Sequence, residues 1–144
     1  MKEKILMKVI CDDREPKNLD AIAKSIGIEL IRERLLTGDY VRNDVCIERK
    51  TIDDFCASII DGRLDSQMER MNKAYNHIYV LVSGSISSRQ STIHENSVLG
   101  KMASILVKHG VSTIVVDNDT QLLYLMKRIF ERHNELKELE VKDG

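Results

Sequence analysis

Short apolar runs alternate with amphipathic segments along this chain, which predicts an α/β protein. Residues 5–11 are apolar except for Lys8 and suit a buried central strand. Further strands are expected at 28–34, 78–83 and 111–116, and a serine-rich loop at 83–92. Apolar residues at helical spacing predict helices at 19–26, 51–60, 63–77 and 95–109, and a last helix from 119 to about 136. We expect Asn18 to cap the first helix and Gly27 to end it.

Residues 39–48 have the pattern of a β-hairpin. Strand-forming residues at 39–42 and 45–48 flank Asn43-Asp44, which suits a two-residue turn. In this register Asp39 lies opposite Glu48. Five or six strands interleaved with helices then make an α/β layer with one core.

The opposed carboxylates of Asp39 and Glu48 suggest a cation site. Two like charges at directly opposed strand positions destabilise a sheet unless a positive charge lies between them. Side chains alternate along a strand, so Lys50 shares the face of Glu48 while Arg49 points away. Two carboxylates and a lysine suit phosphodiester hydrolysis with Mg²⁺, for which Mn²⁺ would substitute. The simpler alternative is a turn residue at Asp39 and a charged edge strand at 48–50.

Several separated motifs resemble the XPF-type structure-specific endonucleases. Gly38-Asp39, Glu48-Arg49-Lys50 and Asp54 fill the family pattern, while residues 12–15 and 62–67 are similar to two of its other segments. The similarity extends over residues 5–135 and implies a restriction-endonuclease-like fold, with a central mixed sheet flanked by helices. It also implies the following catalytic residues: Asp12, Asp39, Glu48, Arg49, Lys50 and Asp54.

The same resemblance implies roles for particular groups. The metal ligands would be Asp39, Glu48, Asp12 and the backbone carbonyl of Arg49. The DNA contacts would be Arg14, Arg63, Gln67 and Arg70.

Three of these assignments have structural alternatives. Thr51 and Asp54 also fit a capping box at the start of a helix. Arg14 suits either a scissile phosphate or a structural ion pair with nearby acids. Arg63, Gln67 and Arg70 lie on a different helical face from Leu64, Met68, Met71 and Tyr75, and would otherwise form a solvated polar face.

Composition adds limits to this interpretation. The 144 residues, 42% hydrophobic and 31% charged, fit a single domain over 1–144, in which 137–144 would form a flexible acidic tail. Three cysteines without paired spacing suit a reducing compartment and give no zinc site. No stretch is long and apolar enough to cross a membrane, so we expect an intracellular protein. A net charge of −1 predicts weak intrinsic affinity for DNA.

The function expected from the sequence is a metal-dependent endonuclease that cuts branched or flapped DNA in repair or recombination. The alternatives are a Holliday-junction resolvase and a noncatalytic scaffold subunit, although inactive partners in this family usually lose the acids that are present here. The helicase and helix-hairpin-helix parts that usually flank the module are expected to be missing.

We also expect a homodimer, or a heterodimer with a DNA-binding partner. The last helix has apolar residues over a wide arc, and a monomer would expose part of it unless the helix is well covered. The expected interface comprises Val98, Met102, Ile105, Leu106, Leu122, Leu123, Leu125, Met126, Ile129 and Phe130.

Overall fold

A six-stranded mixed sheet organises the protein. The computed structural model describes the backbone of residues 5–143 and the side chains of residues 5–141. Residues 1–4 and 144 of the expected domain therefore lie outside the described residues. The strands are β1 (Met7–Asp12), β2 (Ile28–Glu33), β3 (Tyr40–Arg42), β4 (Val45–Thr51), β5 (His77–Ser83) and β6 (Ser112–Val116). The helices are α1 (Leu19–Ser25), α2 (Ile52–Ile60), α3 (Leu64–Ala74), the short 3₁₀ helix η1 (Ile86–Ser88), α4 (Glu95–His109) and α5 (Asp119–Asp143).

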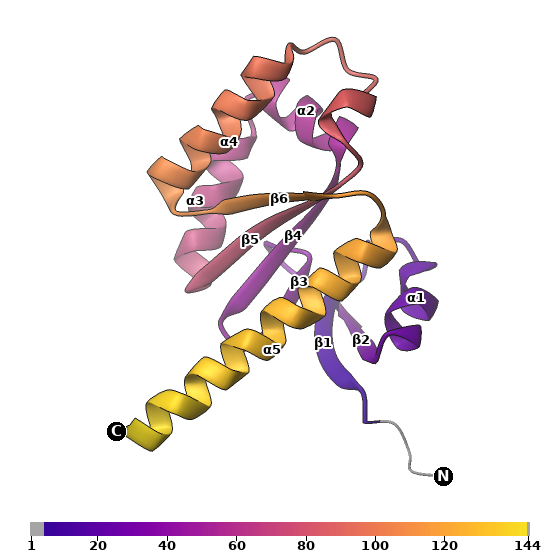
Figure 1. Cartoon of the computed structure of the whole chain (residues 1–144), viewed down its shortest axis with the longest axis vertical. Helices are drawn as coiled ribbons and strands as arrows, with labels where there is room; N and C mark the ends of the chain where they lie inside the picture. The colour runs from indigo at the N-terminus through magenta and orange to yellow at the C-terminus, as the bar shows by residue number, and fades with distance from the viewer. Residues whose placement is uncertain (1–4, 144) are drawn as a thin grey trace.

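The strand order is β2-β1-β3-β4-β5-β6, and β3 is the only described strand that runs antiparallel to its neighbours. The α/β prediction with a central mixed sheet is confirmed. Because β1 and β4 are parallel, both end at the same edge of the sheet, and β3 begins there (Figure 1). Asp12, Asp39 and the end of β4 are thereby brought to one edge, the usual location of functional groups in α/β sheets.

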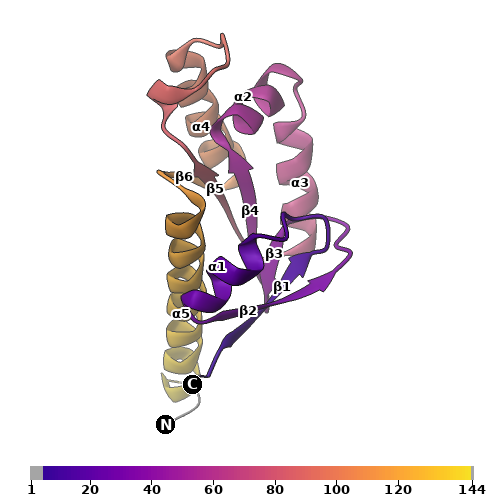
Figure 2. The same cartoon turned by 90° about the vertical axis from the view of Figure 1, so that its right-hand side faces the viewer.

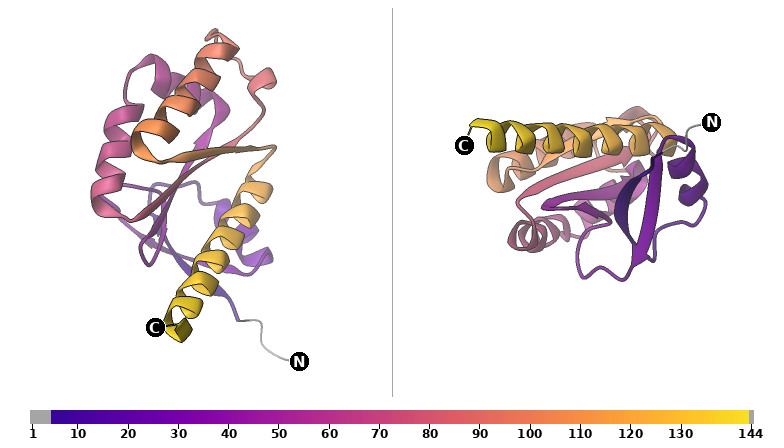
Figure 3. Two further views of the ribbon diagram at one scale, coloured as in Figure 1. Left: turned by 60° about the vertical axis from the view of Figure 1, so that its left-hand side comes forward. Right: turned by 90° about the horizontal axis from the view of Figure 1, so that it is seen from below.

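Helices cover both faces of the sheet. On one face, α2, α3 and α4 pack over a core that includes Val80 and Val82. On the other face, α1 and α5 pack over a core that includes Tyr40, Ile47 and Leu81. Figure 2 shows α3 and α5 on opposite sides of the strands, and Figure 3 shows α5 as a long rod across the sheet.

The expected elements are present with shifted ends. Strand β4 continues to Thr51, and η1 interrupts the serine-rich loop. Helix α3 ends at Ala74, because Tyr75 is already extended and leads into β5. Asn18 stands before α1, but its side chain makes no capping hydrogen bond, so that expectation was wrong. Helix α5 continues to Asp143 instead of ending near Leu136, so the described part of the expected flexible tail, residues 137–143, is helical.

The expected dimer surface is mostly interior. Leu122, Leu123 and Met126 are completely buried, and Phe130 is 1% exposed, because α5 lies on both the sheet and α1. Val98 and Ile105 of α4 are likewise completely buried. The wide apolar arc of α5 is therefore explained by two neighbours within the chain. No helix among residues 5–143 meets the length and hydropathy needed for a membrane span.

Candidate active site

The hairpin forms as the sequence predicts. Tyr40 pairs with Ile47 and Arg42 with Val45, which leaves Asn43 and Asp44 as the two-residue turn. Asn43 has a φ of 56°, the left-handed conformation that such turns require. Gly38 precedes Asp39 with a φ of +84°, and a Cβ at Gly38 would overlap the Sγ atom of Cys46. Glycine is therefore needed to bring the chain into β3.

Three carboxylates occupy one row across neighbouring strands. Cys11 pairs with Tyr40 and Tyr40 with Ile47, so the next positions along these strands are Asp12, Asp39 and Glu48. The Asp12 N–H donates to the Asp39 carbonyl at 2.8 Å, and the Asp39 N–H donates to the Ile47 carbonyl at 3.2 Å. Pairing of β3 with β4 extends as far as Tyr40 and Ile47, and just beyond it the carboxylates of Asp39 and Glu48 interact, as the hairpin predicts.

Asp39 and Glu48 form an uncompensated carboxylate pair. Glu48 is only 8% exposed. Burial, followed by the interaction with Glu48, raises the pKa of Asp39 to about 9. The nearby charge of Glu48 thus favours the form of Asp39 that carries a proton. A divalent cation would replace this proton, and hard carboxylate oxygens are the ligands that Mg²⁺ prefers.

The Glu-Arg-Lys segment presents its side chains to opposite faces of β4. The positive charge of Lys50 lowers the pKa of Asp39, which agrees with the expected position of Lys50 on the acid face. The side chain of Arg49 instead packs on the α5 face, where its Nε donates to Glu15 Oε1 at 2.7 Å. Arg49 contributes to the acid site through its backbone, because its N–H donates to Asp39 Oδ2 at 2.8 Å. The expected direction of the Arg49 side chain, away from Glu48 and Lys50, is therefore confirmed, and its catalytic role stays a prediction.

Asp12 lies in the acid row but is engaged elsewhere. Its Oδ2 accepts from Arg14 Nε at 2.9 Å, and its Oδ1 accepts from the Leu35 N–H at 3.0 Å. Bonds from these two donors lower the pKa of Asp12 despite its burial. Between residues 5 and 141, the structure forms no cluster of three His, Cys, Asp or Glu side chains placed to hold a metal ion. Arg14 and Leu35 bind the oxygens of Asp12 in this arrangement, and its expected role at the metal site stays a prediction.

Two further expected residues have local structural roles. Arg14 makes the ion pair with Asp12, the structural alternative, while its side chain remains 60% exposed. Thr51 caps α2, since its Oγ1 accepts from the Asp54 N–H at 3.1 Å. The capping alternative is therefore confirmed for Thr51, and the Asp54 side chain is exposed in the first turn of α2.

The expected DNA contacts lie on the outer face of α3. Leu64, Met68 and Met71 are completely buried, as the helical spacing predicts. Arg63 makes an exposed ion pair with Asp61 at 3.3 Å, and Arg70 is exposed. Gln67 is half-buried, and its Oε1 has no hydrogen-bond partner within the described part of the chain. The nine residues of α2 separate this polar face from the acid row.

Reasoning from the sequence missed three acids around the site. Asp53 Oδ1 accepts from the N–H groups of Gln90 and Ser91, at 2.8 and 3.3 Å, and so holds the serine-rich loop beside the start of α2. Glu15 and Asp119 bind the Arg49 side chain. Glu15 belongs to the motif at residues 12–15, and its charge within that motif was a signal that could have identified it as a residue of the site. Asp119 lies 70 residues from Arg49, and no local pattern links the two.

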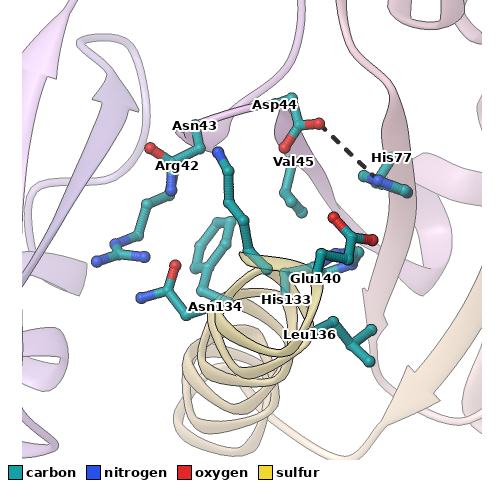
Figure 4. A pocket seen from close by; sticks show the side chains of 11 residues that line it. Arg42, Asn43, Asp44, Val45, His77, His133, Asn134, Leu136 and Glu140 are labelled. Atoms are coloured by element: carbon teal, nitrogen blue, oxygen red, sulfur yellow. Dashed lines mark ion pairs between the residues drawn. The ribbon is translucent and has the colours of Figure 1, made fainter. Parts of the chain in front are cut away.

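A separate hollow of about 160 Å³ lies at the other ends of β4 and β5 (Figure 4). Asp44 contributes to it from the hairpin turn, His77 from β5 and His133 from α5. The rings of His77 and His133 are 4.5 Å apart, and burial together with His77 lowers the pKa of His133. This hollow contains none of the acids of the row, so it is not the candidate active site.

Two known proteins are similar in sequence to most of this chain. A protein from Methanocaldococcus jannaschii described as putative ATP-dependent RNA helicase MJ1505 is 36% identical over 127 residues, which cover 88% of this chain and 16% of that protein. The 3′-flap repair endonuclease Xpf of Saccharolobus solfataricus is 27% identical over 131 residues, covering 89% of this chain and 56% of the relative. The chain thus spans from about a sixth to just over half the length of these relatives.

Solved structures agree with these sequence matches. XPF from Aeropyrum pernix superposes with a TM-score of 0.79 at 29% identity, covering 88% of this chain and 61% of the other. The complex of that protein with DNA gives the same TM-score at 27% identity, covering 91% and 66%.

Fold and site together define an α/β protein of the XPF nuclease type, with a mixed sheet and an acid pair at its carboxyl edge. The ERCC4 domain matches residues 11–129. The chain belongs to the ERCC4 domain family.

Proposed function

We propose that this chain is a divalent-metal-dependent endonuclease that hydrolyses phosphodiester bonds in branched or flapped DNA during repair or recombination inside the cell. The observation that carries this proposal is the buried Asp39–Glu48 pair beside Lys50 at the carboxyl edge of the sheet. Membership of the ERCC4 domain family and the relative named as a 3′-flap repair endonuclease support it.

The residues present fit a Mg²⁺ ion, with Mn²⁺ as a substitute. Asp39, Glu48 and the backbone carbonyl of Arg49 would hold the ion. Asp12 would add negative charge to the same row. When bound, the ion would supply Lewis-acid polarisation of a phosphoryl oxygen and a more acidic water molecule. The raised pKa of Asp39 supports this fit, because it marks a site with excess negative charge.

The other side chains would bind and orient the DNA. Lys50 shares the face of Glu48 and would stabilise the negative charge that develops on the phosphate. The exposed guanidinium of Arg14 is available to a phosphate oxygen beyond its bond to Asp12. Arg63, Gln67 and Arg70 would contact the DNA backbone along α3, as contacts that position the DNA.

Cleavage of a panel of labelled flaps, forks, bubbles and four-way junctions in Mg²⁺ or Mn²⁺ tests the proposal. We expect wild-type protein to cut a branched substrate and Asp39→Asn and Glu48→Gln to be inactive while still folded. Asp20→Asn, which changes an exposed acid of α1, is the control and should cut normally. DNA binding without cleavage by wild-type protein would identify a scaffold subunit instead. Paired cuts in four-way junctions alone would identify a resolvase.

We further propose that the active form is a homodimer, or a heterodimer with a DNA-binding partner. An apolar hollow of about 290 Å³ remains beside α5, lined mainly by Tyr79, Leu125, Ile129 and Leu136. Leu136 is 57% exposed, and Leu139, three residues further along the same helix, extends the apolar surface. A second chain would cover this surface and lengthen the DNA contact of a protein with a net charge of −1.

A further inference from the structure

Arg49 is held from the face of the sheet opposite the acid row. Its Nε donates to Glu15 Oε1 at 2.7 Å, and its Nη1 donates to Asp119 Oδ1 at 3.4 Å. The side chains of Arg49 and Glu15 are each 11% exposed, whereas that of Asp119 is 36% exposed. An ion pair this well buried fixes its geometry more firmly than a surface pair, whose partners exchange with water.

The backbone of Arg49 is directly joined to the acid row. Its N–H donates to Asp39 Oδ2 at 2.8 Å, which orients one of the two carboxylates of the pair. The Asp39 carbonyl in turn accepts from the Asp12 N–H. A shift of the Arg49 backbone would therefore move the Asp39 carboxylate through one hydrogen bond.

Glu15 also belongs to the turn that leaves β1. The Glu15 N–H donates to the Asp12 carbonyl at 3.1 Å, and the Glu15 carbonyl accepts from Arg32 Nη1 at 2.7 Å. Asp119 lies in the first turn of α5. The Arg49 guanidinium thus joins the turn after β1 and the start of α5 to the strand that carries Glu48.

We propose that Glu15 and Asp119 are positioning residues of the active site, which act through Arg49 to hold the Arg49 backbone and the Asp39 carboxylate in place for a divalent cation. Neither acid faces the cation, since both bind the side chain on the far face of β4. This inference rests on the proposed function, because it assumes that Asp39 and Glu48 bind the metal. Groups that orient metal ligands typically change metal affinity by about 10–100-fold when they are removed.

Calorimetric titration of the whole chain with Mn²⁺, without DNA, provides a measurement that is independent of activity. We expect Glu15→Gln to weaken Mn²⁺ binding by about 10-fold, and Asp119→Asn to weaken it less, since its contact is longer and more exposed. Glu135→Gln is the control, because Glu135 makes an exposed pair with Arg132 on α5 and contacts neither Arg49 nor Arg32. Thermal unfolding without metal verifies that each variant is folded, and Asp119→Asn keeps the test available if Glu15→Gln does not fold.

A double-mutant cycle separates positioning from a general loss of charge. If Glu15 acts through Arg49, adding Glu15→Gln to Arg49→Gln should leave Mn²⁺ affinity where Arg49→Gln alone puts it. An equal loss in both backgrounds would overturn the proposal, as would a folded Glu15→Gln variant with wild-type Mn²⁺ affinity. Absence of Mn²⁺ binding by the wild-type chain would instead reject the metal site itself.

Discussion

At the scale of single residues, Asp39 determines the electrostatics of the site. Its folded-state pKa of about 9 exceeds the ordinary value of 3.8, so the folded metal-free protein holds a proton that the unfolded chain releases between these pH values. The contribution of this proton to folding stability is fully present below pH 3.8 and is lost as pH rises towards 9.

Asp39→Asn should therefore change the pH dependence of stability. The variant lacks the titrating group, so its free energy of unfolding should increasingly exceed that of wild type as pH rises from 3.8 to 9 in the absence of metal. Urea unfolding across this pH range measures the difference. Parallel curves for the two proteins would show that Asp39 ionises normally.

Under the proposed function, Lys50 would act in the chemical step, whereas Asp39 would bind the metal ion. Lys50→Ala should lower the cleavage rate by about 10²–10³, the effect of removing one group that stabilises transition-state charge. DNA affinity should fall much less, and Lys24→Ala on α1 should leave both quantities unchanged. Single-turnover cleavage and fluorescence anisotropy measure them separately. A defect confined to affinity would make Lys50 an ordinary phosphate contact.

At the scale of elements, helix α3 is attached to α4 by Asp65. Its Oδ2 accepts from Lys101 Nζ at 2.5 Å, and its Oδ1 contacts His109 Nε2 at 3.0 Å. These partners, Lys101 before His109, lower the pKa of Asp65 to about 2 from 3.8. Helix α3 thus has a polar attachment in addition to its buried stripe of Leu64, Met68 and Met71.

Asp65→Asn should lower the thermal stability near neutral pH. It should also remove part of the loss of stability that wild type shows at acidic pH. A depressed pKa contributes stability that is fully present above pH 3.8 and is lost as pH falls through about 2. Wild type and variant should consequently converge in thermal stability over that interval. Asp61→Asn, at an exposed pair beside α3, serves as the control. A constant gap down to pH 2 would contradict the proposed attachment.

At the scale of the whole molecule, burial of most of the apolar arc of α5 does not decide whether two chains associate. Sedimentation equilibrium at micromolar concentration should give a mass well above the 16.5 kDa of one chain. Leu136→Glu places a charge on the remaining apolar surface of α5 and should restore the monomer mass. Leu36→Glu, at a fully exposed residue of the loop after β2, should not. A wild-type mass near 16.5 kDa throughout would exclude the homodimer and leave only pairing with a different chain.

The sequence by itself determined the hairpin and the acid pair, because both depend on contacts between residues close together in the chain. A two-residue turn fixes the register, and the register places Asp39 opposite Glu48. Alternation along β4 likewise separates Lys50 from Arg49. The buried stripe of α3 follows in the same way from helical periodicity.

Only the tertiary structure decided what the acids and the last helix contact. Asp12 binds Arg14 and Leu35, and Arg49 binds Glu15 and Asp119, across separations as large as 70 residues. The wide apolar arc of α5 predicted an exposed surface, yet the sheet and α1 together cover most of it. Periodicity reports which face of an element is apolar, but the number of neighbours that cover this face depends on the packing of the whole chain.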